Sequence, residues 1–377
     1  MNSRPWLYPV LAAAAIGVWN RFSQDEIYAA EENPAFSQKV SQPGPEVADP
    51  QKYSGQIDFA KLQQAIAGMP KEKLLENIEA TKSVAPEDEN GSAILALLVR
   101  QLAKQDPALA LGKFPEEWNN ETSRLNWAMM EIYGEWVDKD QAAAIAWLDR
   151  QVEAGMFSNT ASAVISDWRY ALESFVFYSL IKNDPAGAAK RIAAIPEDKR
   201  ESVFLWTMRG TRGPEYDEVL ADLTRRYLKE AEASHVLVEY GQRMAVTDDY
   251  GQVDAFFSAA HLTLAEKAQI ARSILSRRIE KVADDEKFMP ALDQARAWAA
   301  THVGGEVDRI TGEALAMNRV DRFANVALHY QESTGSDAVL MAYLTQSRTP
   351  ENRKLIDQIK DTEQRQILME LPQYQTR

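Results

Sequence analysis

One stretch, residues 127–152, WAMMEIYGEWVDKDQAAAIAWLDRQV, constrains the fold more than any other part of the chain. Its first half repeats large apolar residues at steps of three and four, which predicts one apolar face of a helix. That face consists of Trp127, Met130, Tyr133 (or Gly134) and Val137. Asp138, Lys139 and Asp140 then interrupt the pattern. An acidic side chain at such a point caps a following helix, because it accepts hydrogen bonds from the free backbone N–H groups.

The second half of this stretch carries another apolar face. It consists of Ala143, Ala144, Trp147 and Leu148. The small alanines let two helix backbones approach closely, and Trp147 fills the remaining space. We therefore expect a hairpin of two helices. Because one hairpin cannot bury both of its faces, it needs further copies of itself along the chain.

Similar turns occur on both sides of this hairpin. Asp106-Pro107 and Asp184-Pro185 each separate two apolar segments. Asp is a favoured N-cap, and Pro fits the first helical position, where its missing N–H is not needed. Weaker copies turn at Gly213-Pro214, Asp248-Asp249, Asp284-Asp285 and Ser336-Asp337. The turns recur at irregular steps of roughly 30 to 50 residues, which is the range of helical repeats.

A second kind of turn places proline after an apolar residue and before an acid. It occurs at Met69-Pro70-Lys71-Glu72, Ala85-Pro86-Glu87-Asp88, Phe114-Pro115-Glu116-Glu117 and Ile195-Pro196-Glu197-Asp198. Proline ends the preceding helix, and the acids favour the start of the next one. One kind of turn is thus expected within hairpins and the other between them.

These residues resemble the broad class of tetratricopeptide-like and HEAT-like α-helical repeat proteins. The resemblance rests on two neighbouring copies and covers about half of the chain. The first copy contributes Trp127, Tyr133, Asp140, Ala143, Ala144 and Trp147, and the second contributes Leu180, Asp184, Pro185, Ala188, Ala189 and Pro196. The resemblance implies a scaffold that binds protein or peptide, and it supplies no catalytic residues.

We predict an all-α fold: an irregular α-solenoid of stacked antiparallel helical hairpins over residues 57–377. No alternating strand pattern or hairpin turn flanked by strands is found. Beyond the central hairpins, helices are predicted over residues 57–67, 73–81, 92–104, 202–209, 230–244, 253–261, 264–282, 292–301, 306–315, 320–330, 338–344 and 351–360. The polar, Gln-rich end from Asp361 onward is predicted to be a capping helix and a frayed tail.

The N-terminus predicts export. Arg4 precedes an uncharged run from Trp6 to Trp19, which is the layout of a secretory signal. Residues 1–20 are interpreted as a cleaved signal peptide or as an uncleaved membrane anchor, and membrane contact is expected only there. Residues 21–56, polar and rich in proline, are expected to form a disordered linker. The remaining chain would be periplasmic, or anchored and facing the periplasm.

Charge and composition narrow the classes of partner. The formal net charge is −14, whereas binding of nucleic acid needs clustered Lys and Arg. We expect a solvated acidic surface or, as an alternative, an acidic surface for a basic partner. The chain has no cysteine, which excludes disulfides, thiolate metal sites and cysteine nucleophiles.

Several residue patterns bear on catalysis or metal binding. His235 and Glu239 lie one helical turn apart, but a zinc-enzyme helix needs a second histidine. Leu172-Glu173-Ser174-Phe175 is one residue short of the Glu-Ser-x-Phe signature of lytic transglycosylases. Asp248-Asp249 and Asp284-Asp285 are interpreted as helix-starting acids, and Gly304-Gly305 as an isolated turn. No catalytic, cofactor-binding or metal-binding residue is therefore assigned, and no cofactor is expected.

The sequence thus predicts a non-enzymatic α-helical repeat scaffold that binds a protein or peptide on the exported side of a bacterial-type membrane. The alternative is an envelope enzyme, or the helical accessory domain of a cell-wall-acting enzyme.

Overall fold

The computed structural model describes residues 59–84, 89–114, 124–157, 166–207, 213–244, 250–282, 287–318, 322–347 and 350–375. Within these ranges the chain is all-α and contains no strand, as predicted. The first helices are α2 (Phe59–Ala67), α3 (Lys71–Val84), α4 (Glu89–Gln105), α5 (Pro107–Gly112), α6 (Arg124–Lys139), α7 (Gln141–Glu153), α8 (Ser166–Asn183), α9 (Pro185–Ala194) and α10 (Glu197–Trp206). They are followed by α11 (Pro214–Tyr227), α12 (Glu230–Met244), α13 (Tyr250–Ala259), α14 (Leu264–Val282), α15 (Phe288–Val303), the 3₁₀ turn η3 (Gly304–Glu306), α16 (Val307–Met317), α17 (Arg322–Thr334), α18 (Ala338–Gln346), the 3₁₀ helix η4 (Pro350–Gln358) and α19 (Thr362–Glu370).

Aspartate caps begin the second helix of three successive pairs. Asp106 accepts a hydrogen bond from the Leu109 N–H at 3.0 Å at the start of α5. Asp140 accepts one from Ala143 at 3.1 Å before α7, and Asp184 accepts one from Gly187 at 2.9 Å before α9. Each cap satisfies a backbone donor that the helix leaves free. The predicted turns at these three positions are confirmed.

The proline-acid turns also act as predicted where the structure describes them. Helix α9 ends at Ala194, Pro196 precedes α10, and Glu197 and Asp198 occupy the first turn of α10. Helix α10 therefore starts earlier than the predicted range 202–209, because the proline and acids define its N-terminus. The range 351–360, predicted as a helix, is the 3₁₀ helix η4. The ranges 230–244 and 264–282 are confirmed at both ends.

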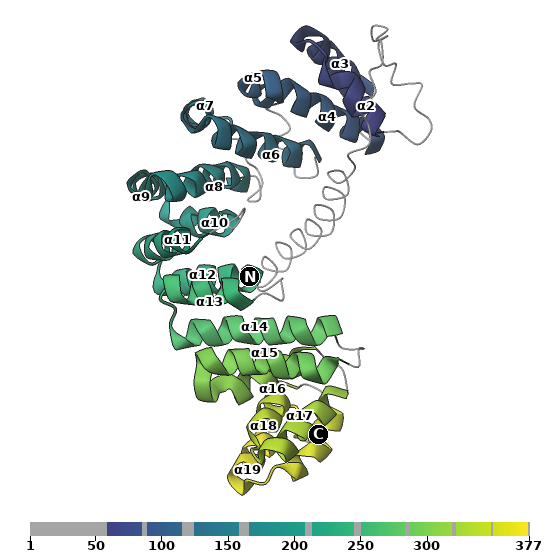
Figure 1. The fold of residues 1–377 in the computed structure, drawn as a ribbon, viewed down its shortest axis with the longest axis vertical. Helices are drawn as coiled ribbons and strands as arrows, with labels where there is room; N and C mark the ends of the chain where they lie inside the picture. The colour runs from purple at the N-terminus through teal and green to yellow at the C-terminus, as the bar shows by residue number, and fades with distance from the viewer. Residues whose placement is uncertain are drawn as a thin grey trace, which may run out of the picture. The chain divides into compact units, whose positions relative to one another are not determined.

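The even-numbered helices form an unbroken series of contacts. Each helix from α2 to α16 packs against the next even-numbered helix, so that α4 contacts α6, α6 contacts α8, and the series ends at α18. Odd-numbered helices, including α3, α5, α7 and α9, pack against even-numbered neighbours. The same order along the chain can be followed in Figure 1. Each described even-numbered helix up to α16 thus packs against the helix two places further along the chain.

Glycines lie at close approaches in these contacts between even-numbered helices. A Cβ atom on Gly312 of α16 would lie 2.3 Å from the Val339 carbonyl oxygen and 2.8 Å from the Tyr343 nitrogen of α18. A Cβ on Gly241 of α12 would lie 2.4 Å from Cδ1 of Ile270 on α14. The α16–α18 contact is therefore backbone against backbone, and no larger residue fits there without movement.

Helix α14 lies between two hydrophobic clusters. Ile270 and Ile274 belong to the cluster that begins at Ile66, whereas Leu275 and Ile279 belong to the one that ends at Tyr374. Tyr250 and Trp298 pack against both clusters, and their rings stack with centroids 4.8 Å apart. One helix with two apolar faces thus joins the two halves of the core.

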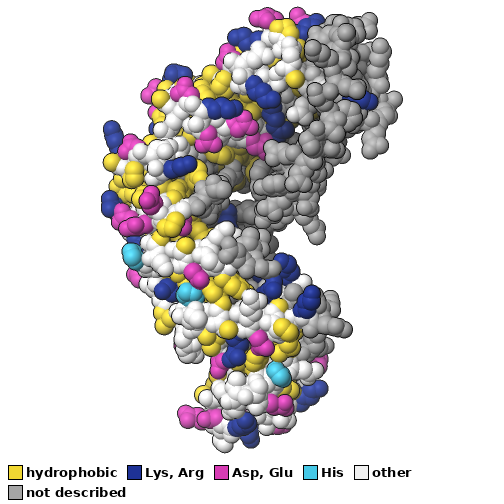
Figure 2. Space-filling view, viewed as in Figure 1, with side chains coloured by type: hydrophobic (Ala, Val, Ile, Leu, Met, Phe, Trp, Pro, Cys, Tyr) yellow, Lys and Arg dark blue, Asp and Glu magenta, His cyan; other side chains and the backbone are white. Residues whose placement is uncertain are grey.

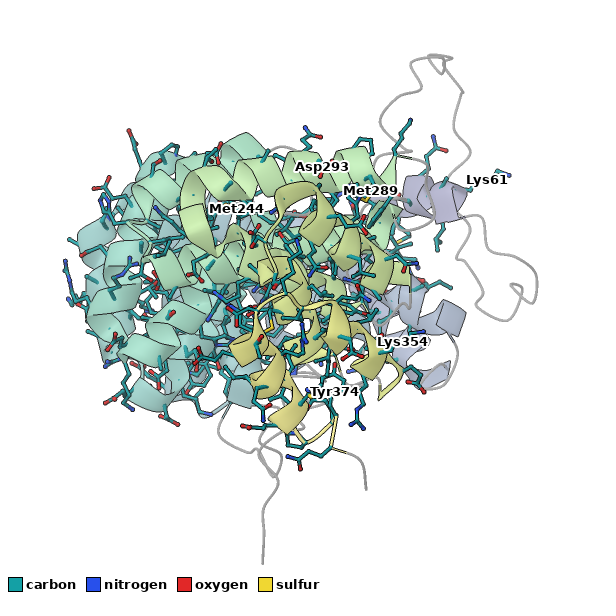
Figure 3. All side chains as sticks on the ribbon, turned by 90° about the horizontal axis from the view of Figure 1, so that it is seen from below. Lys61, Met244, Met289, Asp293, Lys354 and Tyr374 are labelled. Atoms are coloured by element: carbon teal, nitrogen blue, oxygen red, sulfur yellow. The ribbon has the colours of Figure 1, made fainter. Side chains whose placement is uncertain are left out.

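The C-terminal end is fixed by hydrogen bonds. The Tyr374 hydroxyl, near the last helix in Figure 3, donates to the Leu344 carbonyl at 2.9 Å, and burial raises its pKa to about 12. Asp337 accepts hydrogen bonds from the backbone N–H groups of Lys360 and Asp361 at 2.7 and 3.0 Å. Asp361 in turn caps α19. The predicted capping helix is present.

The N-terminal predictions fall outside the described residues. These are the signal or anchor at residues 1–20 and the linker at 21–56. Asp248-Asp249 and Asp284-Asp285 also lie outside them. Among the helices that the structure does describe, none combines the length and apolar character that a membrane span requires.

Candidate functional site

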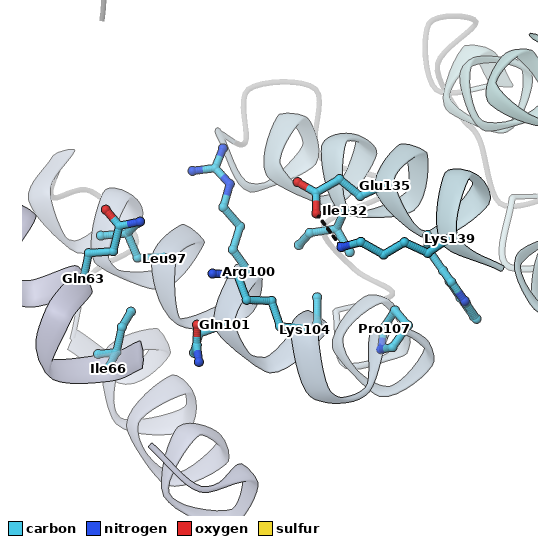
Figure 4. Close-up of a pocket in the computed structure, with 12 residues that line it drawn as sticks. Gln63, Ile66, Leu97, Arg100, Gln101, Lys104, Pro107, Ile132, Glu135 and Lys139 are labelled. Carbon is cyan, nitrogen blue, oxygen red and sulfur yellow. Dashed lines mark hydrogen bonds and ion pairs between the residues drawn. The ribbon is translucent and has the colours of Figure 1, made fainter. Parts of the chain in front are cut away.

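An open groove of about 400 Å³ lies between α2, α4, α5 and α6. We call it the α4–α6 groove, and Figure 4 shows its lining. Its apolar lining consists of Ile66, Leu97, Ala103, Pro107, Ile132 and Trp136. Its polar lining consists of Gln63, Arg100, Gln101, Lys104, Glu135 and Lys139. The groove therefore offers apolar surface and hydrogen-bonding groups in equal numbers of residues.

The two long helices line the groove with the same spacing. Helix α4 contributes Leu97 and the residues three, four and seven positions after it, and α6 contributes Ile132 and the residues at the same three offsets. Residues spaced in this way share one helix face. Each stripe begins with an aliphatic residue and ends with lysine, Lys104 on α4 and Lys139 on α6. Because α4 and α6 pack together, the two stripes converge on one groove.

The Asp106-Pro107 turn positions the short wall of the groove. Asp106 caps α5 and also forms an ion pair with Lys71 of α3, with the Lys71 Nζ 3.3 Å from Oδ2. Pro107 follows directly and lines the groove. On α2, the Ala67 carbonyl accepts a hydrogen bond from the Gln101 side chain at 2.5 Å. The Asp106 cap and these two links fix α5 beside α3, and α2 beside α4.

Two of the three cations that line the groove are already paired. Arg100 forms an ion pair with Glu131 of α6. Lys139 Nζ lies 3.3 Å from Oε2 of Glu135 on the same helix, as Figure 4 shows. The Lys104 side chain is exposed and makes no ion pair or hydrogen bond with the described residues. Among the described residues that line the groove, Lys104 is therefore the cation that no carboxylate pairs with.

Trp136 forms a rigid wall of the groove. It is half-buried, and its ring centroid lies 6.4 Å from that of Tyr133 and 6.0 Å from that of Trp147. Tyr133 is fully buried and donates from its hydroxyl to the Ala144 carbonyl at 3.3 Å. The tryptophan is thus packed on one side and accessible on the other, as interface aromatic residues commonly are.

Glu173, the glutamate of the stretch that is one residue short of the transglycosylase signature, lies in a buried ion pair. Only 3% of its surface is exposed, and both carboxylate oxygens accept hydrogen bonds from Arg191 of α9. Arg191 also contacts Asp149 of α7, with Nη2 2.8 Å from Oδ1. Burial opposes the charge on Arg191, but the two carboxylates outweigh it, so its pKa lies above its usual value. The geometry assigns Glu173 a role in joining α7, α8 and α9.

Tyr133 is close enough to this pair to sense its charge. Burial raises the pKa of the Tyr133 hydroxyl well above its usual value, and the negative charge of Glu173 raises it further. The tyrosine therefore stays protonated and serves as a hydrogen-bond donor.

His235 pairs across helices rather than along its own. Its Nδ1 lies 2.7 Å from Oε1 of Glu201 on α10. The hydrogen bond to Glu201 raises the pKa of His235, burial opposes the shift, and the charges of Glu201 and Glu239 add to it. Of the other histidines, His302 lies 2.8 Å from Oδ1 of Asp254. The described residues include no group of three side chains suited to hold a metal ion.

Of the other sequence candidates that the structure describes, none contributes a side chain to the groove. Gly304 ends α15 with φ +53° and opens η3, so the glycine pair forms a turn, as predicted. Sequence reasoning missed the groove itself. Its signal was present in the spacing of Leu97, Arg100, Gln101 and Lys104, but only the fold shows that α6 carries a matching stripe beside it.

Comparison with protein-family models, curated proteins and solved structures found no match to this chain.

Proposed function

We propose that this chain is a non-enzymatic α-helical repeat scaffold, an irregular solenoid of stacked antiparallel hairpins that binds a protein or peptide. The even-numbered contact series from α2 to α18 supports the solenoid, because repeat arrays bury their cores between successive neighbours. The loose resemblance to tetratricopeptide-like and HEAT-like proteins agrees with it.

The α4–α6 groove is the observation that carries the binding function. Side chains from successive helices line it, and it combines a fixed aromatic wall with polar groups at its edges. Extended binding surfaces of repeat proteins are built in this way. The mixed charge of the surface, visible in Figure 2, and the net charge of −14 favour protein over nucleic acid as the partner.

The binding function is tested by affinity capture with the full-length chain as bait, followed by cross-linking and mass spectrometry. We expect a specific protein whose cross-links map to α4, α5 and α6. An unrelated acidic helical protein of similar size is the control bait. Recovery of no specific protein at low salt, or cross-links confined to distant helices, would contradict the proposal.

We further propose that the scaffold acts on the exported side of a bacterial-type membrane. Residues 1–20 serve as signal or anchor, residues 21–56 as tether, and membrane contact is confined to residues 1–20. The basic start and the uncharged run from Trp6 to Trp19 support this. A C-terminal alkaline phosphatase fusion, active only after export, tests it. Activity that persists when residues 1–20 are deleted would refute it.

A further inference from the structure

We propose that the α4–α6 groove binds a peptide segment of a partner protein in which a carboxylate lies next to a large apolar side chain. The inference rests on the proposed function and names the chemistry of the partner. The apolar side chain would contact Trp136, and the carboxylate would pair with Lys104. Both residues line the same groove from different helices.

The charge of the groove differs from that of the chain as a whole. Three cations and one anion line the groove, Arg100, Lys104 and Lys139 against Glu135, although the chain carries a net charge of −14. Acidic partners are attracted to such a local excess of positive charge even on an acidic protein.

Lys104 gives this excess a specific position. Arg100 and Lys139 are each held by a glutamate, whereas Lys104 forms no ion pair with the described residues. A carboxylate arriving at Lys104 gains a charge-assisted hydrogen bond without displacing an existing one. A basic peptide would instead meet the positive charge of Lys104, which no described carboxylate offsets, and this disfavours it.

Apolar contacts provide the second part of the recognition. Trp136 is packed against Tyr133 and Trp147 on its inner side, so it loses little conformational freedom when a ligand covers its outer side. Pro107 and Ile132 add apolar surface to the lining. The amide of Gln63, exposed on α2 and without a described partner, is suited to a peptide backbone group.

The test uses phage-displayed random 12-residue peptides selected on the full-length chain. We expect the enriched peptides to share an acidic residue next to an aromatic or aliphatic one. The affinity of each enriched peptide, made synthetically with a fluorescent label, is then measured by anisotropy. We expect binding to weaken as NaCl rises from about 50 to 300 mM, because an exposed ion pair is screened.

Two charge-reversal variants test whether the peptides bind at this groove or elsewhere on the surface. Lys104→Glu is expected to weaken binding about tenfold, because it removes an exposed ion pair and adds repulsion. Lys190→Glu, at an exposed lysine of α9 without a described partner, makes the same change elsewhere and should leave affinity unchanged. Trp136→Phe tests the apolar contact with less risk to folding than alanine, and circular dichroism checks each variant.

The outcomes distinguish the inference from the proposed function. Enriched peptides that bind equally well to the Lys104→Glu variant would overturn the groove assignment but leave the scaffold function standing. Basic enriched peptides, or none, would overturn the proposed chemistry of the partner. If the wild-type chain forms a dimer that the Lys104→Glu variant does not, a second copy of the chain occupies the groove. That outcome would also overturn the proposed chemistry of the partner. Failure of affinity capture would count against the scaffold function itself.

Discussion

Arg191 binds Glu173 through two parallel hydrogen bonds, from Nε to Oε2 at 2.8 Å and from Nη2 to Oε1 at 3.1 Å. The pair joins α8 to α9, and Asp149 on α7 extends it to a third helix. Bidentate pairs of this kind fix geometry as well as charge. Because Glu173 is almost completely buried, the stability of the pair depends on both partners being present.

Glu173→Gln is expected to destabilise the chain by about 1–3 kcal/mol, because the half-buried guanidinium of Arg191 loses a charged acceptor and keeps Asp149 as its charged partner. The control is Glu135→Gln, whose exposed pair with Lys139 should contribute about 0.5 kcal/mol or less. Urea denaturation followed by circular dichroism measures both. Equal effects of the two substitutions would show that the buried pair has no special role.

The double variant Glu173→Leu with Arg191→Met is expected to be more stable than Arg191→Met alone. The single change leaves a buried carboxylate without its partner, whereas the double change leaves no buried charge at this position. The same denaturation experiment ranks the two variants. A double variant that is the less stable of the two would contradict this account.

Gly312→Ala is expected to destabilise the chain by about 1–3 kcal/mol, although alanine is the better helix former by about 1 kcal/mol. The added Cβ would meet backbone atoms of Val339 and Tyr343, which cannot move without shifting α18. At Gly134 the Cβ would meet only the Phe175 ring, which can rotate. Gly134→Ala should therefore destabilise the chain less than Gly312→Ala does. Thermal melts that show a larger loss of stability for Gly134→Ala would be inconsistent with the packing of α16 on α18.

Asp184→Ala is expected to cost about 1 kcal/mol, because the Gly187 N–H loses its acceptor at the start of α9. Asp184→Asn keeps an acceptor oxygen and should be nearly neutral. Hydrogen exchange of the Gly187 amide locates the effect, and it should speed up in the alanine variant only. Unchanged exchange in that variant would show that the cap is not needed.

The helix starts could be predicted because their chemistry is local. Asp106, Asp140 and Asp184 each accept from a backbone N–H three residues later, so the caps are visible in a short stretch of sequence. The all-α class could be predicted for a similar reason, because apolar residues at steps of three and four indicate helices within a short stretch of sequence. The contacts between successive even-numbered helices could not be predicted in this way. They depend on the angle at which each helix packs against the next, which no short stretch of sequence defines.

The candidate side chains could not be placed from sequence for the same reason. His235 lies one helical turn from Glu239 on its own helix, but its hydrogen-bond partner is Glu201, on a different helix. The sequence neighbours of Glu173 resemble part of a catalytic signature. Its structural role instead depends on its ion pair with Arg191, 18 residues away. The α4–α6 groove likewise needs the register between two helices, which helical periodicity alone leaves undefined.

The His235–Glu201 pair predicts a pH dependence of stability. The hydrogen bond to Glu201 raises the pKa of His235 in the folded chain above the value of about 6.5 expected when it is unfolded. The folded state therefore binds this proton more tightly. The resulting stabilisation is fully present below about pH 6.5 and disappears as the pH rises through the raised pKa.

Denaturation of the wild type and of His235→Gln across pH 5–9 measures this effect. The difference in stability should be largest at the acidic end and should fall toward zero at the alkaline end, with a smaller amplitude at high salt because the side chain is 54% exposed. Glu201→Gln should lower the pKa of His235, which a titration of ¹³C-labelled histidine by NMR reports directly. A His235 pKa that is the same in Glu201→Gln and in the wild type would show that the 2.7 Å contact does not determine it.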